Sequence, residues 1–483
     1  MVLSHNKSLV KKLQRIVGDP YVIYKPEDLI VFEYDGSVDK HLPIIVTLPA
    51  STEEVSGVVK TAREYELPIV ARGAGTGLSG GAIAAKGGIV ITLTRMTKIL
   101  DIDPINLSAV VEPGVVNIDL THQAIKHGLY FAPDPSSQKA CTIGGNVAEN
   151  SGGPHCLAYG VTTNHVLGME VVLADGSVHW LGGEPRESPG YDLRGIVVGS
   201  EGTLAIITKV VVRLLREPEA IKTTLIAFNR IEDASRAVSE IIARGIVPAA
   251  IEMMDHLCIQ AAEASVHAGY PEGAGAILLV EIDGLSETVH EESIEIEAVC
   301  NHFDPIEIRT ASDPSERERL WSGRKGVLGA LGRLAPNYYL VDGTIPRTKL
   351  LEVLTKINQI SDDIGLPIAN LLHAGDGNLH PSVLFDERKS GDTEKALYAG
   401  GKILKLCVDV GGVLSGEHGI GIEKQEYLPL MFTPDDLAAM ALLKPAFETD
   451  DVFNPGKIFP TGSVCIDLSQ TAVVSRVGRG AFI

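Results

Sequence analysis

The sequence is poor in the features that mark several classes of protein. Its six cysteines, at positions 141, 156, 258, 300, 407 and 465, include no CxxC pair and no short paired spacing. In a chain of 483 residues this argues for reduced thiols rather than a disulfide framework or a zinc finger. Aromatic residues make up only 5%, and no apolar run approaches the roughly 18 residues that span a bilayer. We therefore expect a cytoplasmic protein, attached at most to the inner face of a membrane.

Basic charge is also scarce. Lys and Arg total 42 against 62 Asp and Glu, which gives a formal net charge of −20, and no run of basic residues interrupts this excess. Such a chain is a poor nonspecific ligand for phosphate backbones, so we exclude nucleic acid as a partner. The hydrophobic fraction of 45% is ordinary for a globular protein, and the length favours two or more domains.

The N-terminus lacks the continuous apolar core of a signal peptide. Leu9, Val10, Leu13, Ile16 and Val17 instead fall at helical spacing, with most basic residues on other faces. This pattern favours a surface helix that opens the first domain. A transit peptide or a membrane-surface helix is the alternative.

Strand-like and helical patterns alternate along the chain and predict an α+β fold. Short apolar runs separated by glycine-rich turns extend from Ile44 to about Leu215, with helical patterns over 52–65 and 118–127. A polar, proline-containing stretch at 216–220 then marks a boundary before a second sheet. We predict a first domain over 1–216, a second over 217–425, a C-terminal helical segment over 426–460 and a tail over 461–483. The tail is interpreted as a docking arm or a partly disordered end.

Glycine is abundant, with 50 residues, and the first glycine-rich segment is RGAGTGLSGG at 72–81. Gly75 to Gly80 match GxGxxG, the dinucleotide fingerprint, but that motif requires a following helix. The strand-like run GGIVITL at 87–93 follows too soon to leave room for one. We therefore reject the Rossmann interpretation and expect a loop whose own backbone N–H groups cradle a diphosphate. A plain glycine-rich turn is the alternative.

Two further segments share this composition. PDPSSQKACTIGGNVAENSGGPHCLAYG, at 133–160, is too long and too rich in small polar residues for a simple connection, which is typical of a functional loop. VVGSEGTLAIIT, at 197–208, places a tight turn before a buried strand.

Histidine and carboxylate residues gather in HAGDGNLHP, at 373–381, and SGEHGIG, at 415–421. Gly375 and Gly377 disfavour a helix between His373 and His380, whereas a strand–turn–strand would bring the two imidazoles together. With Glu417 they form a ligand set for a divalent cation that leaves positions open for substrate. His418 remains as a titratable base. By itself this cluster fits a metal-dependent hydrolase as well as an oxidoreductase.

The three glycine-rich segments, in this order and spacing, resemble the FAD-binding segments of the vanillyl-alcohol-oxidase/PCMH flavoprotein superfamily. The resemblance implies that the first loop wraps the FAD diphosphate, the second follows the ribityl chain and isoalloxazine, and the third approaches the adenine. It implies noncovalent FAD, because the first loop holds no histidine. The implied contacts are Arg72, Gly73, Ala74, Gly75, Thr76, Gly77, Leu78, Ser79, Pro133, Ser136, Thr142, Ile143, Gly144, Gly145, Asn146, Ser151, Gly152, Gly199, Glu201 and Ile206.

The second half resembles the glycolate oxidase D-subunit and D-lactate dehydrogenase group of that superfamily. The resemblance rests on LWSGRKGVLGALGRLAPNYYLVDGTIPR (320–347), NLLHAGDGNLHP (370–381), GGVLSGEHGIG (411–421) and FNPGKIFP (453–460). Together with the FAD segments it covers roughly residues 10 to 460. It implies a PCMH-type FAD-binding domain, an α+β substrate (cap) domain with an antiparallel sheet, and a C-terminal segment that returns to the flavin with Asn454.

The same resemblance implies the chemistry. A divalent metal (Zn, Mn or Fe) would lie on His373, His380 and Glu417, with His418 as base on the substrate hydroxyl and Arg324 on the substrate carboxylate. Lys325 either shares that role or is a solvated charge. The implied reaction is the oxidation of a small D-2-hydroxy acid to the 2-oxo acid. Its electrons would pass to an iron–sulfur partner subunit, a quinone or a cytochrome, and a homodimer is compatible with this function.

Three positions depart from the related hydroxyglutarate enzymes. Leu328 and Leu340 stand where those enzymes use a threonine and a lysine for the distal carboxylate, which favours glycolate or lactate as substrate. Ser382 stands where they place an asparagine. Two other functions remain open: a transferase similar to alkyl-glycerone-phosphate synthase, and a flavin-binding subunit without activity of its own.

Overall fold

The computed structural model describes residues 2–183, 190–448 and 450–461, and these form two compact units. Within the described residues, the first unit contains the chain up to 152, then 161–217 and everything from 417 onward. The second unit contains 153–160 and 218–416. Each unit is described by itself below.

The first unit begins with the predicted amphipathic helix α1 (Val2–Val17), which buries Leu9, Leu13 and Val17. A four-stranded sheet has the order β1-β2-β4-β3, in which β2, β4 and β3 run parallel. Helix α3 (Thr52–Glu64) packs on this sheet and starts where the Ser51 side chain accepts from the Glu54 amide. The strands are β1 (Val22–Ile23), β2 (Ile45–Thr47), β3 (Ile69–Arg72) and β4 (Ile89–Thr92).

A second, antiparallel sheet of the first unit has the order β5-β6-β10-β8-β9. Helices α4 (Asn117–Ala124) and α5 (Ile143–Glu149) pack with it around one apolar cluster. The sequence predicted a helix over 118–127, which the structure confirms as α4 and a following 3₁₀ turn, but it did not predict α5. The strands are β5 (Ile99–Asp103), β6 (Ser108–Val111), β8 (Val166–Val172), β9 (Val178–Gly182) and β10 (Ile206–Arg213).

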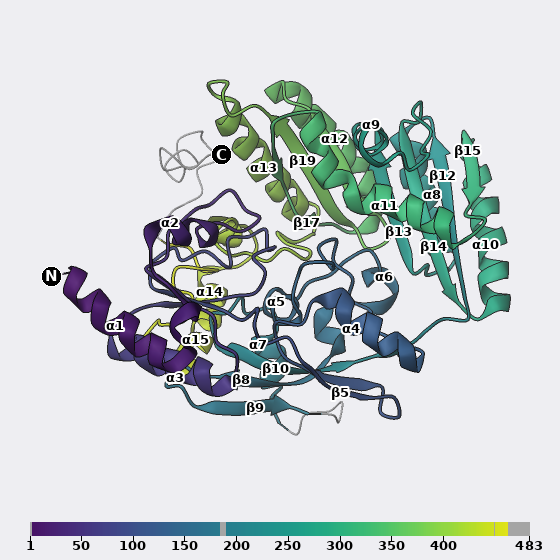
Figure 1. Ribbon diagram of the computed structural model, residues 1–483. Coiled ribbons are helices and arrows are strands. Elements are labelled where there is room, and N and C mark those ends of the chain that lie inside the picture. The colour runs from purple at the N-terminus through teal and green to yellow at the C-terminus, as the bar shows by residue number, and fades with distance from the viewer. Residues whose placement is uncertain (1, 184–189, 449, 462–483) are drawn as a thin grey trace. The chain divides into compact units, whose positions relative to one another are not determined.

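The second unit is built on the predicted antiparallel sheet, with the order β15-β12-β14-β13-β18-β19-β16 and β17 paired to β19. Helices α9 and α11 pack on one face, and α8, α10, α12 and α13 pack on the other (Figure 1). The strands are β12 (Ala220–Phe228), β13 (Ala250–Asp255), β14 (Ala276–Gly284), β15 (Glu307–Thr310), β16 (Asn337–Leu340), β17 (Gly343–Thr344), β18 (Ile368–His373) and β19 (Asn378–Phe385). The helices are α8 (Ile231–Ala243), α9 (His256–Val266), α10 (Ser286–Asn301), α11 (Pro314–Ala330), α12 (Leu350–Ile364) and α13 (Asp392–Asp409).

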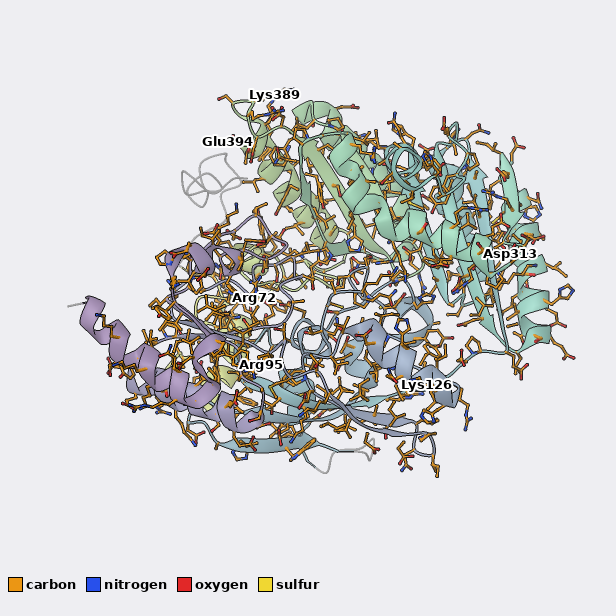
Figure 2. The ribbon with its side chains drawn as sticks, in the orientation of Figure 1. Arg72, Arg95, Lys126, Asp313, Lys389 and Glu394 are labelled. Carbon is orange, nitrogen blue, oxygen red and sulfur yellow. The ribbon has the colours of Figure 1, made fainter. Side chains whose placement is uncertain are left out.

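Helix α11 carries Arg324 and has a well-defined start. Asp313, labelled in Figure 2, accepts from the Glu316 amide at 2.9 Å, and Pro314 occupies the first helical position. An aspartate cap followed by proline is a typical helix start, because the carboxylate accepts from a first-turn amide and proline has no N–H to leave unpaired. The cap thereby fixes the residue at which the helix starts, and with it the side of the helix on which Arg324 lies.

The unit boundaries differ from the linear boundaries predicted from the sequence. Residues 417–425, which the sequence placed in the second domain, pack in the first unit because Ile420 N and Gly421 N donate to Glu201. Residues 153–160, which the sequence placed in the first, belong to the second, where Tyr159 donates to Asp283 at 2.7 Å. The segment predicted to be helical over 426–460 contains a 3₁₀ helix and the short helices α14 (Pro434–Ala441) and α15 (Leu443–Phe447).

Two other predictions concern absences. The five cysteines within the described ranges are not joined in disulfides, and Cys465, with the predicted tail beyond Thr461, lies outside those ranges. Among the described helices, none combines the length and apolar composition that crossing a membrane requires.

Candidate active site

The first glycine-rich segment leaves β3 as a loop that reaches β4 without a helix, as predicted. Gly75 has φ +72°, and a Cβ there would lie 2.2 Å from Arg72 Nη2, so the Arg72 guanidinium folds back over the loop (Figure 2 labels Arg72). A Cβ on Gly73 would lie 2.4 Å from Thr142 Oγ1. The glycines of this loop therefore permit close packing against an arginine and against the second segment.

The second segment is anchored by helix α5. Thr142 caps the helix by accepting from the Gly145 amide at 3.3 Å. The buried Asn117 donates to both the Pro133 carbonyl and Asn146 Oδ1, each at 3.0 Å. Three predicted cofactor contacts, Pro133, Thr142 and Asn146, are thus brought together, and Ser151 and Gly152 follow directly after α5.

The third segment bonds to the same helix. The amides of Gly199 and Glu201 donate to the carbonyls of Val147 and Ala148 at 2.9 and 2.8 Å. The Glu201 carboxylate accepts from Ile420 N and Gly421 N, both at 2.7 Å, and so holds the end of the segment that carries Glu417 and His418. Ile206 begins β10 and is fully buried in the core.

The C-terminal FNPGKIFP motif closes over the first and third segments. Asn454 Nδ2 donates to the carbonyls of Gly81 and Glu201, at 2.8 and 2.7 Å. The buried ammonium of Lys457 donates to Gly80 and Gly81 carbonyls and to Asn454 Oδ1. Burial lowers the pKa of Lys457 to about 8, against the opposing charges of nearby carboxylates. The sequence-based interpretation missed Lys457.

The residues of these loops fit a bound diphosphate. In the part of the chain that the structure describes, Arg72 Nη1 and Ser79 Oγ are buried and have no hydrogen-bond partner. Buried polar groups are normally satisfied, so two unsatisfied ones beside a glycine loop indicate a place for a polar ligand. A diphosphate accepts hydrogen bonds and favours the arginine charge. Ala74 and Ser136 are exposed in the same region.

Glu149, at the end of α5, is a further residue that the sequence did not reveal. A Cβ on Gly81 would lie 2.4 Å from one Glu149 carboxylate oxygen, and a Cβ on Gly419 would lie 2.5 Å from the other. The Glu149 carboxylate therefore packs directly against both glycines. Burial, together with the negative charges of Glu201 and Asp35, raises the pKa of Glu149 well above its usual value. Burial and neighbouring negative charge therefore both favour the neutral form of this carboxyl.

In the second unit, polar residues occupy one end of an otherwise apolar sheet face. Side chains alternate along a strand, so Glu252 shares its face with Ala250 and Met254, which pack under α9 and α11. Glu281, His373 and His380 lie on the same face of neighbouring strands. On α11 the spacing of Arg317, Trp321 and Arg324 places all three on one side of the helix, above this polar row.

The predicted strand–turn–strand around the two histidines is confirmed. Strands β18 and β19 pair with His373 opposite Asn378 and Leu371 opposite His380, which makes the histidines diagonal neighbours on one face. Their rings meet edge to face with centroids 5.1 Å apart, and both side chains are buried.

Glu252 connects His373 to Arg324. It lies directly opposite His373 on β13, and His373 Nδ1 is 2.7 and 2.9 Å from its two oxygens. Arg324 Nε donates to Glu252 Oε2 at 2.5 Å, and the Arg324 Nη2 forms an ion pair with the same oxygen. Burial opposes the ionisation of Glu252, but the charges of Arg324 and His373 outweigh it and lower the pKa of Glu252. The sequence-based interpretation identified Arg324 and His373 but missed Glu252.

Asp342 holds the chain directly before the remaining predicted residues, Glu417 and His418. This fully buried carboxylate accepts from Ser415 Oγ at 2.6 Å and from Gly416 N at 3.1 Å, and its Oδ1 lies 4.0 Å from His380 Nδ1. Glu417 follows Gly416 directly, and consecutive Cα atoms are about 3.8 Å apart. Glu417 and His418 begin the next stretch of the first unit, where Glu417 Oε1 is 3.9 Å from His418 Nε2.

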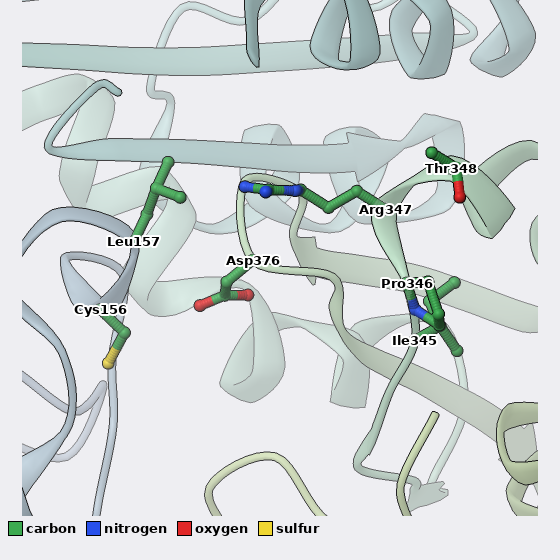
Figure 3. A pocket seen from close by; sticks show the side chains of 7 residues that line it. All are labelled: Cys156, Leu157, Ile345, Pro346, Arg347, Thr348 and Asp376. Carbon is green, nitrogen blue, oxygen red and sulfur yellow. The ribbon is translucent and has the colours of Figure 1, made fainter. Parts of the chain in front are cut away.

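An open pocket of about 560 Å³ lies beside the histidine turn, within the second unit. Figure 3 shows Asp376 of that turn and Arg347 among its lining residues. Arg347 Nη1 donates to the Gly375 carbonyl at 3.0 Å and so helps to hold the turn. Leu328, one of the positions that departs from the hydroxyglutarate enzymes, packs instead against the apolar cluster under α11.

Comparisons with known proteins agree with this arrangement. Residues 43–182 match the model of an FAD binding domain, and residues 217–458 match the C-terminal domain of FAD linked oxidases. The chain belongs to the FAD-linked oxidase family. It is 44% identical to the glycolate oxidase subunit GlcD of Escherichia coli strain K12, over 96% of this chain and 94% of that protein. It is 35% identical to a D-lactate dehydrogenase of Archaeoglobus fulgidus, over 93% of this chain and 99% of that one.

Solved structures of low sequence identity share the fold of this FAD-linked oxidase. p-Cresol methylhydroxylase with substrate bound gives a TM-score of 0.78 at 18% identity, over 94% of this chain and 96% of that one. Alkyldihydroxyacetonephosphate synthase gives 0.74 at 19% identity, over 93% and 86%. The predicted architecture, a PCMH-type FAD-binding domain with an α+β domain on a large antiparallel sheet, is therefore confirmed.

Proposed function

We propose that this FAD-linked oxidase oxidises a small D-2-hydroxy acid, glycolate or D-lactate, to the corresponding 2-oxo acid. The observation that carries the proposal is that Arg324 of α11 lies against His373, which meets His380 on one face of the second sheet, in a relative of glycolate oxidase subunit GlcD. A guanidinium suits the substrate carboxylate, and imidazoles suit a cation at the hydroxyl. Bound FAD supplies the acceptor for the hydride that leaves the substrate carbon.

The protein's own residues would bind and deprotonate the acid. Arg324 has five N–H donors and directs its Nε and Nη2 groups at Glu252. Its remaining donors would bind the substrate carboxylate. His418 would accept the hydroxyl proton on an imidazole nitrogen, because histidine titrates near neutral pH. Asp342 and Glu201 hold the amides of Gly416, Ile420 and Gly421, and so fix both ends of the segment that carries His418.

A divalent cation (Zn, Mn or Fe) bound by His373, His380 and Glu417 would supply positive charge at the substrate hydroxyl oxygen. The donor set fits such an ion: two buried imidazoles meet edge to face, and Nδ1 of His373 already bonds to Glu252. Its Nε2 lone pair is therefore the atom offered to a cation.

We propose further that the electrons pass to an iron–sulfur partner subunit, a quinone or a cytochrome. The description of the E. coli relative as a subunit supports a partner protein. A cytoplasmic location, with attachment at most to the inner face of a membrane, and a homodimer are compatible with this proposal.

Anaerobic mixing tests the function. The purified protein should be yellow, and glycolate or D-lactate should bleach its flavin faster than L-lactate or D-2-hydroxyglutarate. His418→Ala should retain flavin and reduce it about 10²–10⁴-fold more slowly, because it lacks the base. His179→Ala, which removes an exposed histidine of β9, is the matched control and should reduce at the wild-type rate.

Other outcomes decide between the alternatives. A colourless protein that releases no flavin on denaturation would refute every flavin function. A yellow protein that none of the acids bleaches would favour the transferase or the inactive flavin-binding subunit. Equal reduction by wild type and His418→Ala would remove His418 from the role of base.

A further inference from the structure

Glu252 is a fully buried carboxylate of the second unit that contacts two predicted site residues. Its exposed fraction is 0%, and it lies in the middle of β13 between the strands that carry Glu281 and His373. Burying an isolated carboxylate in such a place would cost much free energy, so its partners must compensate for that cost. Those partners are His373 and Arg324.

The three side chains define which ring nitrogen of His373 carries its proton. Arg324 has donors only, and its Nη2 lies 3.4 Å from His373 Nδ1. An arginine can bond to Nδ1 only if Nδ1 is unprotonated, whereas the carboxylate of Glu252, at 2.7 Å, requires Nδ1–H. The shorter contact is with the carboxylate, and Glu252 therefore accepts from both neighbours. The lone pair of His373 is then on Nε2, on the opposite side of the ring.

We propose that Glu252 is a positioning residue that sets the tautomer and orientation of His373 for a divalent cation and aligns Arg324 for the substrate carboxylate. This inference rests on the metal site of the proposed function. A carboxylate behind a histidine ligand raises the basicity of the ring and limits its rotation, and removing such a partner typically weakens metal binding about 10–100-fold. One residue would thereby couple the cation to the substrate's anionic end.

Glu252→Gln is the informative substitution because it keeps the shape and removes one acceptor. A glutamine amide has one oxygen and an NH₂ group, and here it would face the N–H of His373 and the N–H groups of Arg324. One of these donors must then meet the NH₂ group. Either His373 turns or Arg324 loses its partner.

The adjacent strand offers a matched control. Glu281 of β14 is 1% exposed, lies on the same sheet face and accepts from an arginine of the same helix, with Arg317 Nε and Nη2 at 2.8 and 2.6 Å. Its partners in the structure include His155 and Trp321 rather than the two paired histidines. Glu281→Gln thus removes an equivalent buried carboxylate without touching the proposed ligands.

The experiment measures the affinity of the flavin-loaded, metal-stripped protein for Zn²⁺ and Mn²⁺ by competition with a chromophoric chelator. Flavin content and melting temperature are recorded for each variant. We expect Glu252→Gln to bind about 10–100-fold more weakly than wild type, and Glu281→Gln to bind like wild type. Glu252→Asp keeps the charge and should recover part of the affinity, so a poorly folded glutamine variant does not decide the test.

Two results would overturn the inference in distinguishable ways. If Glu252→Gln, with wild-type flavin content, binds both cations as tightly as wild type, Glu252 does not position His373 and the metal site itself stands. If wild type binds neither cation more tightly than His380→Ala does, the metal site of the proposed function fails and the role of Glu252 fails with it.

Discussion

At the scale of single residues, buried carboxylates organise the second unit. Glu281 accepts from His155 Nε2, Arg317 and Trp321 Nε1, so it joins the segment 153–160 to α11. Burial opposes its ionisation, but the hydrogen bonds from His155 and Arg317 outweigh it and place the pKa of Glu281 well below its ordinary 4.5. The carboxylate is therefore an ionised structural link.

This link makes stability depend on pH in a defined direction. Because the folded-state pKa of Glu281 is depressed, its contribution is fully present above about pH 4.5 and is lost as the pH falls through the lower, folded value. Glu281→Gln should lower the free energy of unfolding at pH 7 by about 1.5–3 kcal/mol, the range for hydrogen bonds to a charged group. The side chain of Arg317 is 37% exposed, so we do not expect the larger cost of a fully buried pair.

Denaturant unfolding of wild type and Glu281→Gln between pH 7 and pH 3 measures this dependence. Below about pH 4.5 the difference between the two free energies should shrink, because Glu281 of the wild type then takes up a proton. A difference that stays constant across the whole range would contradict the assignment of an ionised, low-pKa carboxylate.

The residues that the sequence identified were those within short motifs, and those it missed act across long separations. His373 and His380 stand in one nine-residue motif, whereas Glu252 reaches partners 72 and 121 positions further along the chain. A sequence pattern contains no such pairing. The one available indication was a glutamate inside the apolar run IEMMD, since a buried charge requires a partner.

At the scale of elements, local sequence signals predicted the histidine hairpin, which is the strand pair β18 and β19 with its turn, but they did not predict helix α5. Gly375 and Gly377 disfavoured a helix between the two histidines and so predicted the strand–turn–strand, because that indication is local. Helix α5 begins Ile143-Gly144-Gly145, which is unfavourable for a helix. Packing requires a glycine at position 144, because a Cβ there would lie 2.6 Å from Pro113. That contact was invisible in the sequence.

The turn of the histidine hairpin should tolerate no side chain at Gly377. This residue has φ +84°, and a Cβ would lie 2.2 Å from the Ile345 backbone oxygen. Gly377→Ala should combine a left-handed strain of about 1–2 kcal/mol with a backbone displacement beside the two histidines. We expect a lower melting temperature and a loss of cation affinity.

Gly365, at the end of α12, provides the matched control for this substitution. It has φ +68° but open space around its Cβ position, so Gly365→Ala carries the conformational strain without the clash. Thermal unfolding and the chelator competition should show a modest destabilisation with unchanged cation affinity. Equal effects of the two substitutions on both measurements would rule out a special constraint at Gly377.

At the scale of the whole molecule, the first unit is discontinuous in sequence. Its last described segment begins at 417, two hundred residues after the preceding one ends at 217. Phe453 of this segment is fully buried beside Ile69 in the core, and Asn454 and Lys457 bond to Gly80 and Gly81. Linear boundaries drawn from composition could not predict this return, although the family resemblance did imply it.

A fragment ending at residue 217 should therefore fail to hold FAD. It would expose the space filled by Phe453, a loss of about 3–5 kcal/mol by analogy with large-to-small core substitutions. It would also leave the buried carboxylate of Glu201 without the amides of Ile420 and Gly421, and the loop at Gly80–Gly81 without Lys457.

Fusing residues 417–461 to this fragment through a flexible Gly/Ser linker restores every one of these contacts within a single unit. We expect the fusion to be yellow after purification and the fragment to be colourless or insoluble, with flavin absorbance per mole of protein as the measurement. A soluble 1–217 fragment that binds FAD as tightly as the full chain would show that the C-terminal segment is an accessory to the flavin site rather than part of its framework.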